Sequence, residues 1–356
     1  VNAIVSMLGS AKALRRLSVT NSELSPSQLL DIPKALAKSE VKALILDLSG
    51  NDNLHGSTTF KEFIQVCEAA GKALGGLRLL NTSLDATELT HLYAEMTGGA
   101  GARLTLVELA VTLHPLADKE VVPVTIKSPR ALTSSPSRNL KHSQSSKTVK
   151  LTAGEAAPAP EGATTRVKEL FGAVQQATCL RRLTLGGGVP LGSALMPLLK
   201  SLSDAPHLAE LDIRQQAIGD AGAEAMGTAL QDGAQLRVLY VDQNSFTAKG
   251  FAALGAGVAR SSSIIDFPVP VAEYRALCDV KGADPDALQK IIIDIEDLAN
   301  KNRIDVGSVP SDEEVLSSKK QADADDDDDD DDASSSHEAE QEKLKKKKSS
   351  KKSKKK

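Results

Sequence analysis

A repeat of 28 residues in the second half of the chain constrains the fold more than any other feature. The apolar pattern L-x-x-L-x-L opens there at Leu180, Leu208, Leu236 and Ile264. Looser copies, at intervals of 27, 33 and 30 residues, open upstream at Leu14, Val41, Leu74 and Leu104. A recurring period of this length predicts a solenoid, in which each unit buries its apolar face against its neighbours. About eight units are therefore expected.

Each unit combines a strand with a helix. The apolar residues Leu208, Leu211 and Ile213 first follow the strand pattern. From Ala221 onward they recur at intervals of three and four, which places them on one face of a helix. Gly219-Asp220 separates the two halves, because glycine permits a tight turn and aspartate caps a helix. The repeated unit predicts an α/β fold.

The units resemble the ribonuclease-inhibitor-like class of leucine-rich repeats. The resemblance rests on LAELDIRQQAIGDAGAEAMGTALQDGAQ and LRVLYVDQNSFTAKGFAALGAGVARSSS and extends over about residues 10–270. It implies a right-handed leucine-rich-repeat solenoid. In that class an asparagine or cysteine stands eight residues after the first leucine, and here we find it only as Asn244. Some turns are therefore expected to be irregular at the equivalent positions, which are Ser22, Ser49, Thr82, Thr112, Gly188 and Gln216.

Composition divides the chain into five segments. Repeats occupy residues 1–114 and 163–270, and 48 residues beyond one unit separate Leu104 from Leu180. This surplus, residues 115–162, is rich in Ser, Pro, Ala and Lys, which predicts a disordered insertion. A helical cap (271–303) and a disordered charged tail (304–356) follow.

The cap is predicted from its own pattern. Asp284 is a suitable N-cap with Pro285 at the first helical position. The apolar stripe of the helix consists of Leu288, Ile291, Ile292, Ile295, Leu298 and Ala299. The helix must cover the core of the last repeat, and a homodimer surface on the same helix is the second role that remains open.

The segment SIIDFPVPVAEYRALCDVKGADPDALQKIIIDIEDLANKNR resembles the end of the repeat domain in the CARMIL family, the linkers of actin capping protein, Arp2/3 and myosin I. Its Phe-Pro-x-Pro motif at Phe267 and the residues Ala287, Leu288 and Ile291 carry the resemblance. It implies an actin-regulating scaffold whose last helices cap the solenoid and help it self-associate.

The charge of the chain is concentrated in the tail. Fifteen acidic residues lie between Asp312 and Glu342, and ten lysines lie between Lys343 and Lys356. Blocks of like charge do not fold. The lysine block predicts contact with an anionic surface, nucleic acid or an import receptor, and a solubilising tail is the alternative.

No catalytic, cofactor-binding or metal-ligating residue is assigned. The histidines do not pair with cysteine or carboxylates at ligand spacing; they are His55, His91, His114, His142, His207 and His337. Gly186–Ser193 lacks the lysine of a phosphate loop and falls at a repeat turn. We therefore expect a protein that is not an enzyme and needs no cofactor.

The expected compartment is the cytoplasm. Cys67, Cys179 and Cys278 are widely separated and odd in number, which indicates free thiols in a reducing environment. The sequence shows neither a secretory signal nor an apolar run of about 18 residues. Because it opens with Val1, we expect a fragment from which an upstream domain could be missing.

The concave face of the sheet is the expected partner site. Strand side chains alternate, so the third, fifth and seventh residues of each unit should face outward. Two zones follow from this rule. The first is an apolar patch of Ile45, Leu80 and Leu106 in repeats two to four, and the second is a mixed-charge zone in repeats six and seven, where Asp212, Arg214 and Asp242 surround Tyr240. Arg182 of the fifth repeat is a further candidate for the partner site. The other outward residues include Arg16, Asp47, Arg78, Glu108, Glu210 and Val238. Coverage of these positions by neighbouring loops is the alternative.

Three functional hypotheses remain. The first is a non-catalytic protein-interaction scaffold linked to the actin cytoskeleton, with a cytoskeletal location. The second is a GTPase activator resembling RanGAP, which also joins such repeats to an acidic tail. Against it, eight repeats are fewer than that family has, and no catalytic arginine can be assigned. The third is a nuclear protein that uses the lysine-rich tail.

Overall fold

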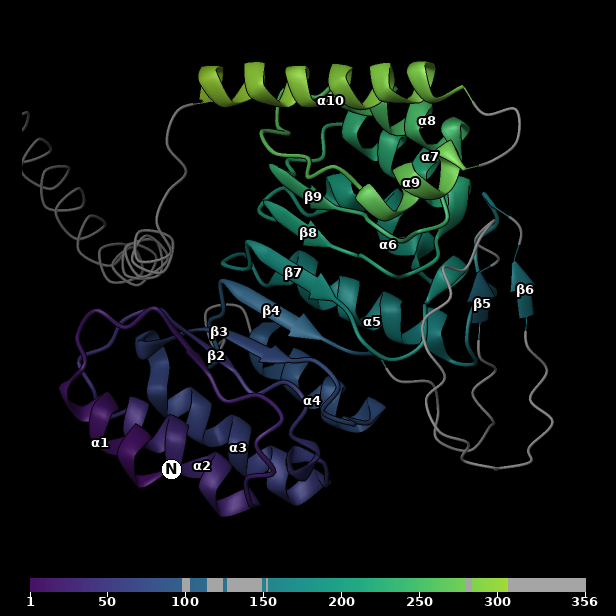
Figure 1. The fold of residues 1–356 in the computed structure, drawn as a ribbon. Helices are drawn as coiled ribbons and strands as arrows, with labels where there is room; N and C mark the ends of the chain where they lie inside the picture. The colour runs from purple at the N-terminus through teal and green to yellow at the C-terminus, as the bar shows by residue number, and fades with distance from the viewer. Residues whose placement is uncertain (98–102, 114–123, 127–148, 152, 280–283, 307–356) are drawn as a thin grey trace, which may run out of the picture.

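Seven parallel strands form one open sheet in the described part of the chain (Figure 1). The computed structural model describes residues 1–97, 103–113, 124–126, 149–151, 153–279 and 284–306. The strands pair in the order β1 (Arg16–Ser18), β2 (Leu44–Asp47), β3 (Leu74–Leu79), β4 (Glu108–Val111), β7 (Arg182–Leu185), β8 (Glu210–Asp212) and β9 (Val238–Tyr240). The eighth expected strand is reduced to a single parallel bridge between Val238 and Asp266. The α/β class is confirmed, and the open parallel sheet is consistent with a solenoid.

Strand pairing corrects the register of two repeats. Leu46 pairs with Leu17 and with Leu77, so the second unit opens at Ala43 and not at Val41. Leu109 pairs with Leu77 and Leu183, so the fourth unit opens at Leu106 and not at Leu104. Each stretch contains two overlapping apolar patterns offset by two residues. Because side chains alternate with a period of two, this shift keeps the strand residues on the same faces, but it makes Leu106 the first leucine of its unit.

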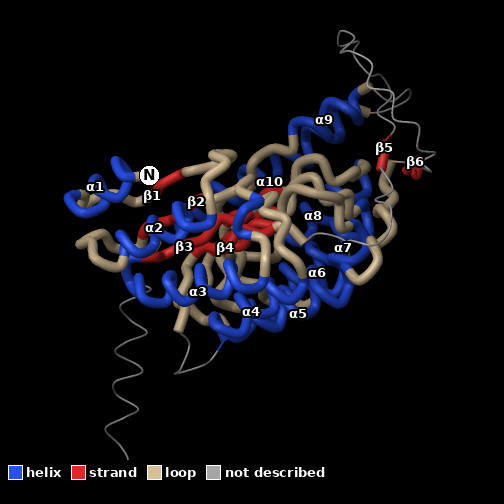
Figure 2. The backbone as a smooth tube through the Cα atoms, turned by 90° about the horizontal axis from the view of Figure 1, so that it is seen from below, coloured by secondary structure: helices blue, strands red, loops and turns tan. Residues whose placement is uncertain are grey.

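Helices follow the strands and cover the outer side of the sheet (Figure 2). After α1 (Asn2–Ser10) they are α2 (Pro26–Leu36), α3 (Ser57–Ala70), α4 (Ala86–Thr97), α5 (Ala163–Gln176), α6 (Met196–Lys200), α7 (Gly219–Gln231) and α8 (Ala248–Val258). Their starts follow local chemistry, as in α2, where the Ser25 hydroxyl accepts from Gln28 N and the Gln28 side chain accepts from Ser25 N. The core lies between this helical layer and the strand leucines.

Two buried asparagines fix turns at opposite ends of the sheet. Asn51 Oδ1 accepts from Ser22 N (3.2 Å), and its Nδ2 donates to Val19 O (2.7 Å) and Leu48 O (2.9 Å). Asn244 repeats the pattern, accepting from Gln216 N and donating to the carbonyls of Ile213 and Val241. The expectation that Asn244 alone fills this position was therefore wrong, because the register error had placed Ser49 there.

A stretch of the expected insertion has a defined path along the loops after β7, β8 and β9. Gly154 N donates to Ser245 O (2.8 Å), and Gly154 O accepts from Asp220 N (2.9 Å). Ala157 N donates to Ala217 O, and Ala157 O accepts from Ser193 N, both at 2.8 Å. We call residues 153–162 the strap. It leads directly into α5.

The strap and two short strands correct the expectation of disorder across 115–162. β5 (Val124–Ile126) and β6 (Val149–Leu151) pair in parallel within the insertion. The small residues of the strap let its backbone come close enough to the loops to form these hydrogen bonds. The strap is therefore ordered although it lacks large apolar side chains. A Cβ on Gly219 would lie 2.5 Å from Ala156 N. The rest of the insertion lies outside the described residues.

Two helices occupy the segment in which the cap is expected. After α9 (Val271–Cys278), α10 (Pro285–Val306) begins where Asp284 Oδ1 accepts from Ala287 N (3.0 Å). The predicted stripe packs against α8, with Leu288, Ile292, Ile295 and Ala299 buried and Ile291 and Leu298 partly buried. Asn302 Nδ2 also donates to Ile264 O (2.8 Å), which joins α10 to the last unit. The charged tail lies outside the described residues.

Candidate partner-binding face

The register aligns the outward side chains of all seven strands into rows on the inner face. The third positions form one row, consisting of Arg16, Ile45, Gly76, Glu108, Arg182, Glu210 and Val238. The fifth positions form a second row, consisting of Ser18, Asp47, Arg78, Ala110, Thr184, Asp212 and Tyr240. The pairing aligns the predicted outward residues that lie within the strands, and Leu80, Leu106, Arg214 and Asp242 lie outside the strands.

The expected apolar patch does not form. Leu106 is 2% exposed and belongs to the core, because the corrected register makes it the first leucine of its unit. Ile45 is 9% exposed, and Leu80 is half-buried. These three side chains therefore offer little apolar surface to a partner.

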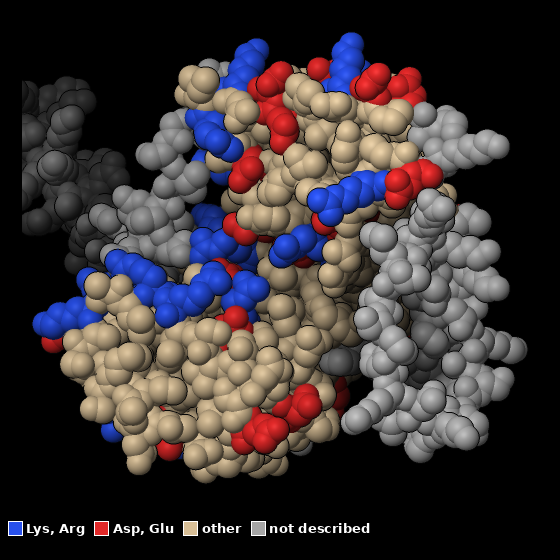
Figure 3. Space-filling model, viewed as in Figure 1, with Lys and Arg blue, Asp and Glu red and all other residues tan. Residues whose placement is uncertain are grey.

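Charged side chains occupy the face in place of that patch. We call Arg16, Arg78, Arg182 and Glu108 the arginine cluster. The Glu108 carboxylate accepts from Arg78 Nη1 at 2.6 Å and from Arg182 Nε at 3.0 Å. Arg16 Nη2 lies 3.9 Å from the same carboxylate, and Arg78 Nε lies 3.5 Å from Asp47 Oδ2. Figure 3 shows Lys and Arg side chains gathered across the middle of this view.

The arginine cluster was not grouped from the sequence, although each member was placed on the outward face. Glu108 and Arg182 are 74 residues apart in the chain, on either side of the insertion. Only the pairing of β4 with β7 brings them together. Three arginines and a glutamate at the outward positions of one sheet were the signal available.

The second zone is partly assembled as expected. Arg214 Nε and Nη2 donate to Asp212 Oδ1 (2.9 Å) and Oδ2 (2.6 Å), and the guanidinium carbon lies 5.3 Å from the centre of the Tyr240 ring. We call Asp212, Arg214 and Tyr240 the Tyr240 cluster. The hydrogen bond to Asp212 raises the pKa of Arg214, and burial raises that of Tyr240.

Asp242 is turned toward the cap and not toward the Tyr240 cluster. Its Oδ1 accepts from Ala272 N (3.0 Å) at the start of α9. The neighbouring Glu273 carboxylate accepts from the backbone N–H groups of Gln243 and Asn244. Burial raises the pKa of Glu273 to about 8, with a smaller contribution from its hydrogen bond to Asp242. Sequence reasoning did not identify Glu273.

His55 pairs with carboxylates, contrary to the expectation. His55, Asp85 and Glu88 place ligand atoms within 4.8 Å of one another. Glu88 is occupied, however, because Oε1 accepts from Gly56 N (2.6 Å) and Oε2 from Asp85 N (2.8 Å). Asp85 in turn accepts from Glu88 N, which completes a capping box at the start of α4. The arrangement is that of a helix cap linking two units.

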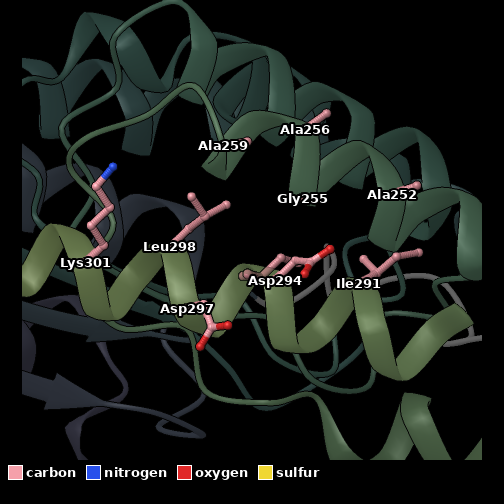
Figure 4. Close-up of a pocket in the computed structure, with 10 residues that line it drawn as sticks. Ala252, Gly255, Ala256, Ala259, Ile291, Asp294, Asp297, Leu298 and Lys301 are labelled. Carbon is pink, nitrogen blue, oxygen red and sulfur yellow. The ribbon is translucent and has the colours of Figure 1, made fainter. Parts of the chain in front are cut away.

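A groove of about 630 Å³ lies between α8 and α10. Its α8 side consists of small residues, and Leu298 extends toward them from α10 (Figure 4). Asp294, Asp297 and Lys301 also line it. The groove borders α10, the helix for which a homodimer surface is one of the two expected roles. That role remains a prediction.

Comparisons with known proteins give partial similarities. No family model matches the chain. Protein CARMIL of Dictyostelium discoideum is 37% identical over 82 residues, which are 23% of this chain and 8% of that protein. The Rho GTPase-activating protein gacW of the same organism is 25% identical over 304 residues, 83% of this chain and 25% of that protein. The chain thus spans a quarter or less of the length of these relatives.

Among solved structures, the Rad7–Elc1 complex of yeast aligns with 75% of this chain and 65% of its own, with 17% identity and a TM-score of 0.35. The similarity to Protein CARMIL supports the resemblance found from the sequence over part of the chain. None of the described helices has the length and hydropathy that a membrane-spanning helix needs.

Proposed function

We propose that this chain is a non-catalytic protein-interaction scaffold in the regulation of the actin cytoskeleton, and that its partner binds the inner face of the sheet. The observation that carries the proposal is the continuous outward face of seven paired strands. On it, Arg16 and Arg214 are exposed near opposite ends. Neighbouring loops therefore leave these two positions uncovered.

The similarity to Protein CARMIL supports the actin-related part of the proposal. The arrangement of Arg214 and Tyr240 supports the protein-binding part, because arginine and tyrosine concentrate binding energy at protein interfaces. A cytoskeletal location follows from the same proposal.

A GTPase activator of the RanGAP-like kind is the second candidate. It is favoured by the similarity, over 83% of this chain, to a protein named as a Rho GTPase activator. The nuclear role of the lysine-rich tail remains a third prediction, tested by whether deletion of Lys343–Lys356 changes the location of the chain.

The test is a crosslinked affinity purification of the full chain from its own cells. One variant carries Arg214→Ala and Tyr240→Ala on the inner face. The matched control carries Lys61→Ala and Lys168→Ala, two exposed positions on the outer helices α3 and α5. Thermal unfolding of all three proteins establishes that they remain folded.

Loss of actin-regulatory proteins from the inner-face variant alone supports the scaffold. Recovery of a small GTPase in their place favours the activator, and the hydrolysis of GTP by Rho-type and Ran-type GTPases is then measured with and without the chain. Partners that both variants retain equally would overturn the assignment of the inner face.

A further inference from the structure

The arginine cluster is built in two layers. The Glu108 side chain is 3% exposed, so its carboxylate lies beneath the arginines, and the Asp47 side chain is 16% exposed. The side chains of Arg16, Arg78 and Arg182 are 54%, 20% and 24% exposed, so the guanidinium groups form the outer layer. Glu210 stands beside Arg182 in the same row, so three arginines face three carboxylates in formal charge, and the most exposed charge of the group is the Arg16 guanidinium.

The cluster is held in place from below. Arg78 and Arg182 share the Glu108 carboxylate, which limits the rotation of both side chains. Gly76 lies between Ile45 and Glu108 in the same row, and a Cβ there would come within 2.9 Å of Glu108 Cβ. The missing side chain leaves the space beside Glu108 that Arg16 approaches from β1. Guanidinium groups that are already positioned lose less entropy when they bind a ligand.

We propose that the arginine cluster binds aspartate or glutamate side chains of an acidic segment in a protein partner. The proposal rests on the function proposed above and names the chemistry of the partner. Guanidinium groups recognise carboxylates through paired N–H donors, and such charge-assisted hydrogen bonds are stronger than neutral ones.

The surroundings favour an acidic protein segment over a nucleic acid. Asp47 and Glu210 stand in the same rows as the arginines, and they would repel the closely spaced phosphates of a continuous polyanion. Tyr240 is the one aromatic side chain in the two rows, so successive bases would lack a stacking surface. A peptide can place single carboxylates on the arginines and leave neutral residues opposite Asp47 and Glu210.

Site-specific photocrosslinking on the full chain tests the proposal. Benzoylphenylalanine replaces Ser18, an exposed residue of β1 in register with Asp47, or Lys61 on the outer helix α3 as the control position. The probes are fluorescent deca-glutamate, deca-lysine and a 12-nucleotide single-stranded DNA. Because crosslinks report position, peptide bound to the lysine-rich tail does not interfere.

We expect deca-glutamate to label position 18 and not position 61. Arg16→Gln should reduce this labelling about tenfold, and Asp47→Asn should increase it about threefold, because one removes and the other adds net positive charge. Lys168→Gln, a matched change on α5, should leave it unchanged. Opposite effects of two substitutions on one face are not expected from a merely structural role.

Equal labelling at both positions, or changes in the same direction with Arg16→Gln and Asp47→Asn, would overturn the proposal. Stronger labelling by DNA than by peptide would assign the cluster to nucleic acid instead. Substitutions in the Tyr240 cluster could abolish recovery of the partners while deca-glutamate does not label position 18. That result would support the scaffold function and reject only the acidic partner.

Discussion

Asn51 and Asn244 make equivalent hydrogen bonds in two distant units, which shows what one residue contributes to each turn. Each amide joins the carbonyl of its own strand end to the preceding unit. Asn51→Ala should lower the free energy of unfolding by about 2–3 kcal/mol, because several buried backbone groups lose their partners. Urea denaturation measures the change. Ser22→Ala, whose hydroxyl bonds Thr20 O in an exposed position, serves as the control, and equal effects of the two would contradict the role of the amide.

Glu273 plays a comparable role after the last repeat, and its titration makes the free energy of unfolding depend on pH. Its carboxylate accepts from the backbone of Asn244, where a further unit would have supplied a side-chain acceptor. Burial raises its pKa from 4.5 to about 8, so the folded state holds a proton that the unfolded state releases. This contribution to the free energy of unfolding is full below about pH 4.5 and is lost as the pH rises through 8, with a total of roughly 5 kcal/mol.

Glu273→Gln mimics the protonated side chain and should remove this dependence. The urea midpoint of the native protein should fall between pH 5 and pH 9 by more than that of the variant. Parallel pH profiles for the two proteins would show that Glu273 titrates normally in the folded state.

The elements show which parts of the structure a local pattern can predict. The strands and the cap helix follow from apolar spacing, because each buries its side chains against the nearest unit. The register at Val41 and Leu104 did not follow, since Ala43 and Leu106 open equally acceptable patterns two residues later. The arginine cluster and the strap depend on contacts between residues far apart in sequence, and no local pattern contains that information.

The strap is the element for which composition gave the wrong answer, and its packing can be tested at one glycine. Gly219 has a φ of +61°, and a side chain there would meet the backbone of the strap at Ala156. Gly219→Ala should therefore destabilise the chain by more than the approximately 1 kcal/mol that positive φ alone costs. It should also open residues 153–162 to limited proteolysis.

Gly233→Ala is the matched control for the strap. Gly233 has a φ of +97° with nothing within 4 Å of an added Cβ, so it carries the backbone strain without the clash. If both variants lose the same stability and neither is cut in the strap, the strap does not depend on Gly219.

At the scale of the whole molecule, the strap changes how the units depend on one another. Units of a solenoid contact only their neighbours, so they can unfold separately. The strap instead bonds to the loops after β7, β8 and β9 within four residues of chain, from Gly154 to Ala157. The units that contain these strands should therefore unfold together, whereas those of β1 to β3 should open first.

Two equivalent core substitutions separate these outcomes. Leu46 in β2 and Leu211 in β8 are both fully buried, and replacing either by alanine should cost roughly 3 kcal/mol. Hydrogen exchange in low urea should then show loss of protection confined to β1, β2 and β3 for Leu46→Ala. For Leu211→Ala, protection should be lost together in β7, β8, β9 and the amides of Gly154 and Ala157. Exchange of β8 in Leu211→Ala while β9 and the strap stay protected would mean that the strap does not couple the units. Loss of protection along the whole sheet in both variants would mean that the chain unfolds as a single cooperative unit.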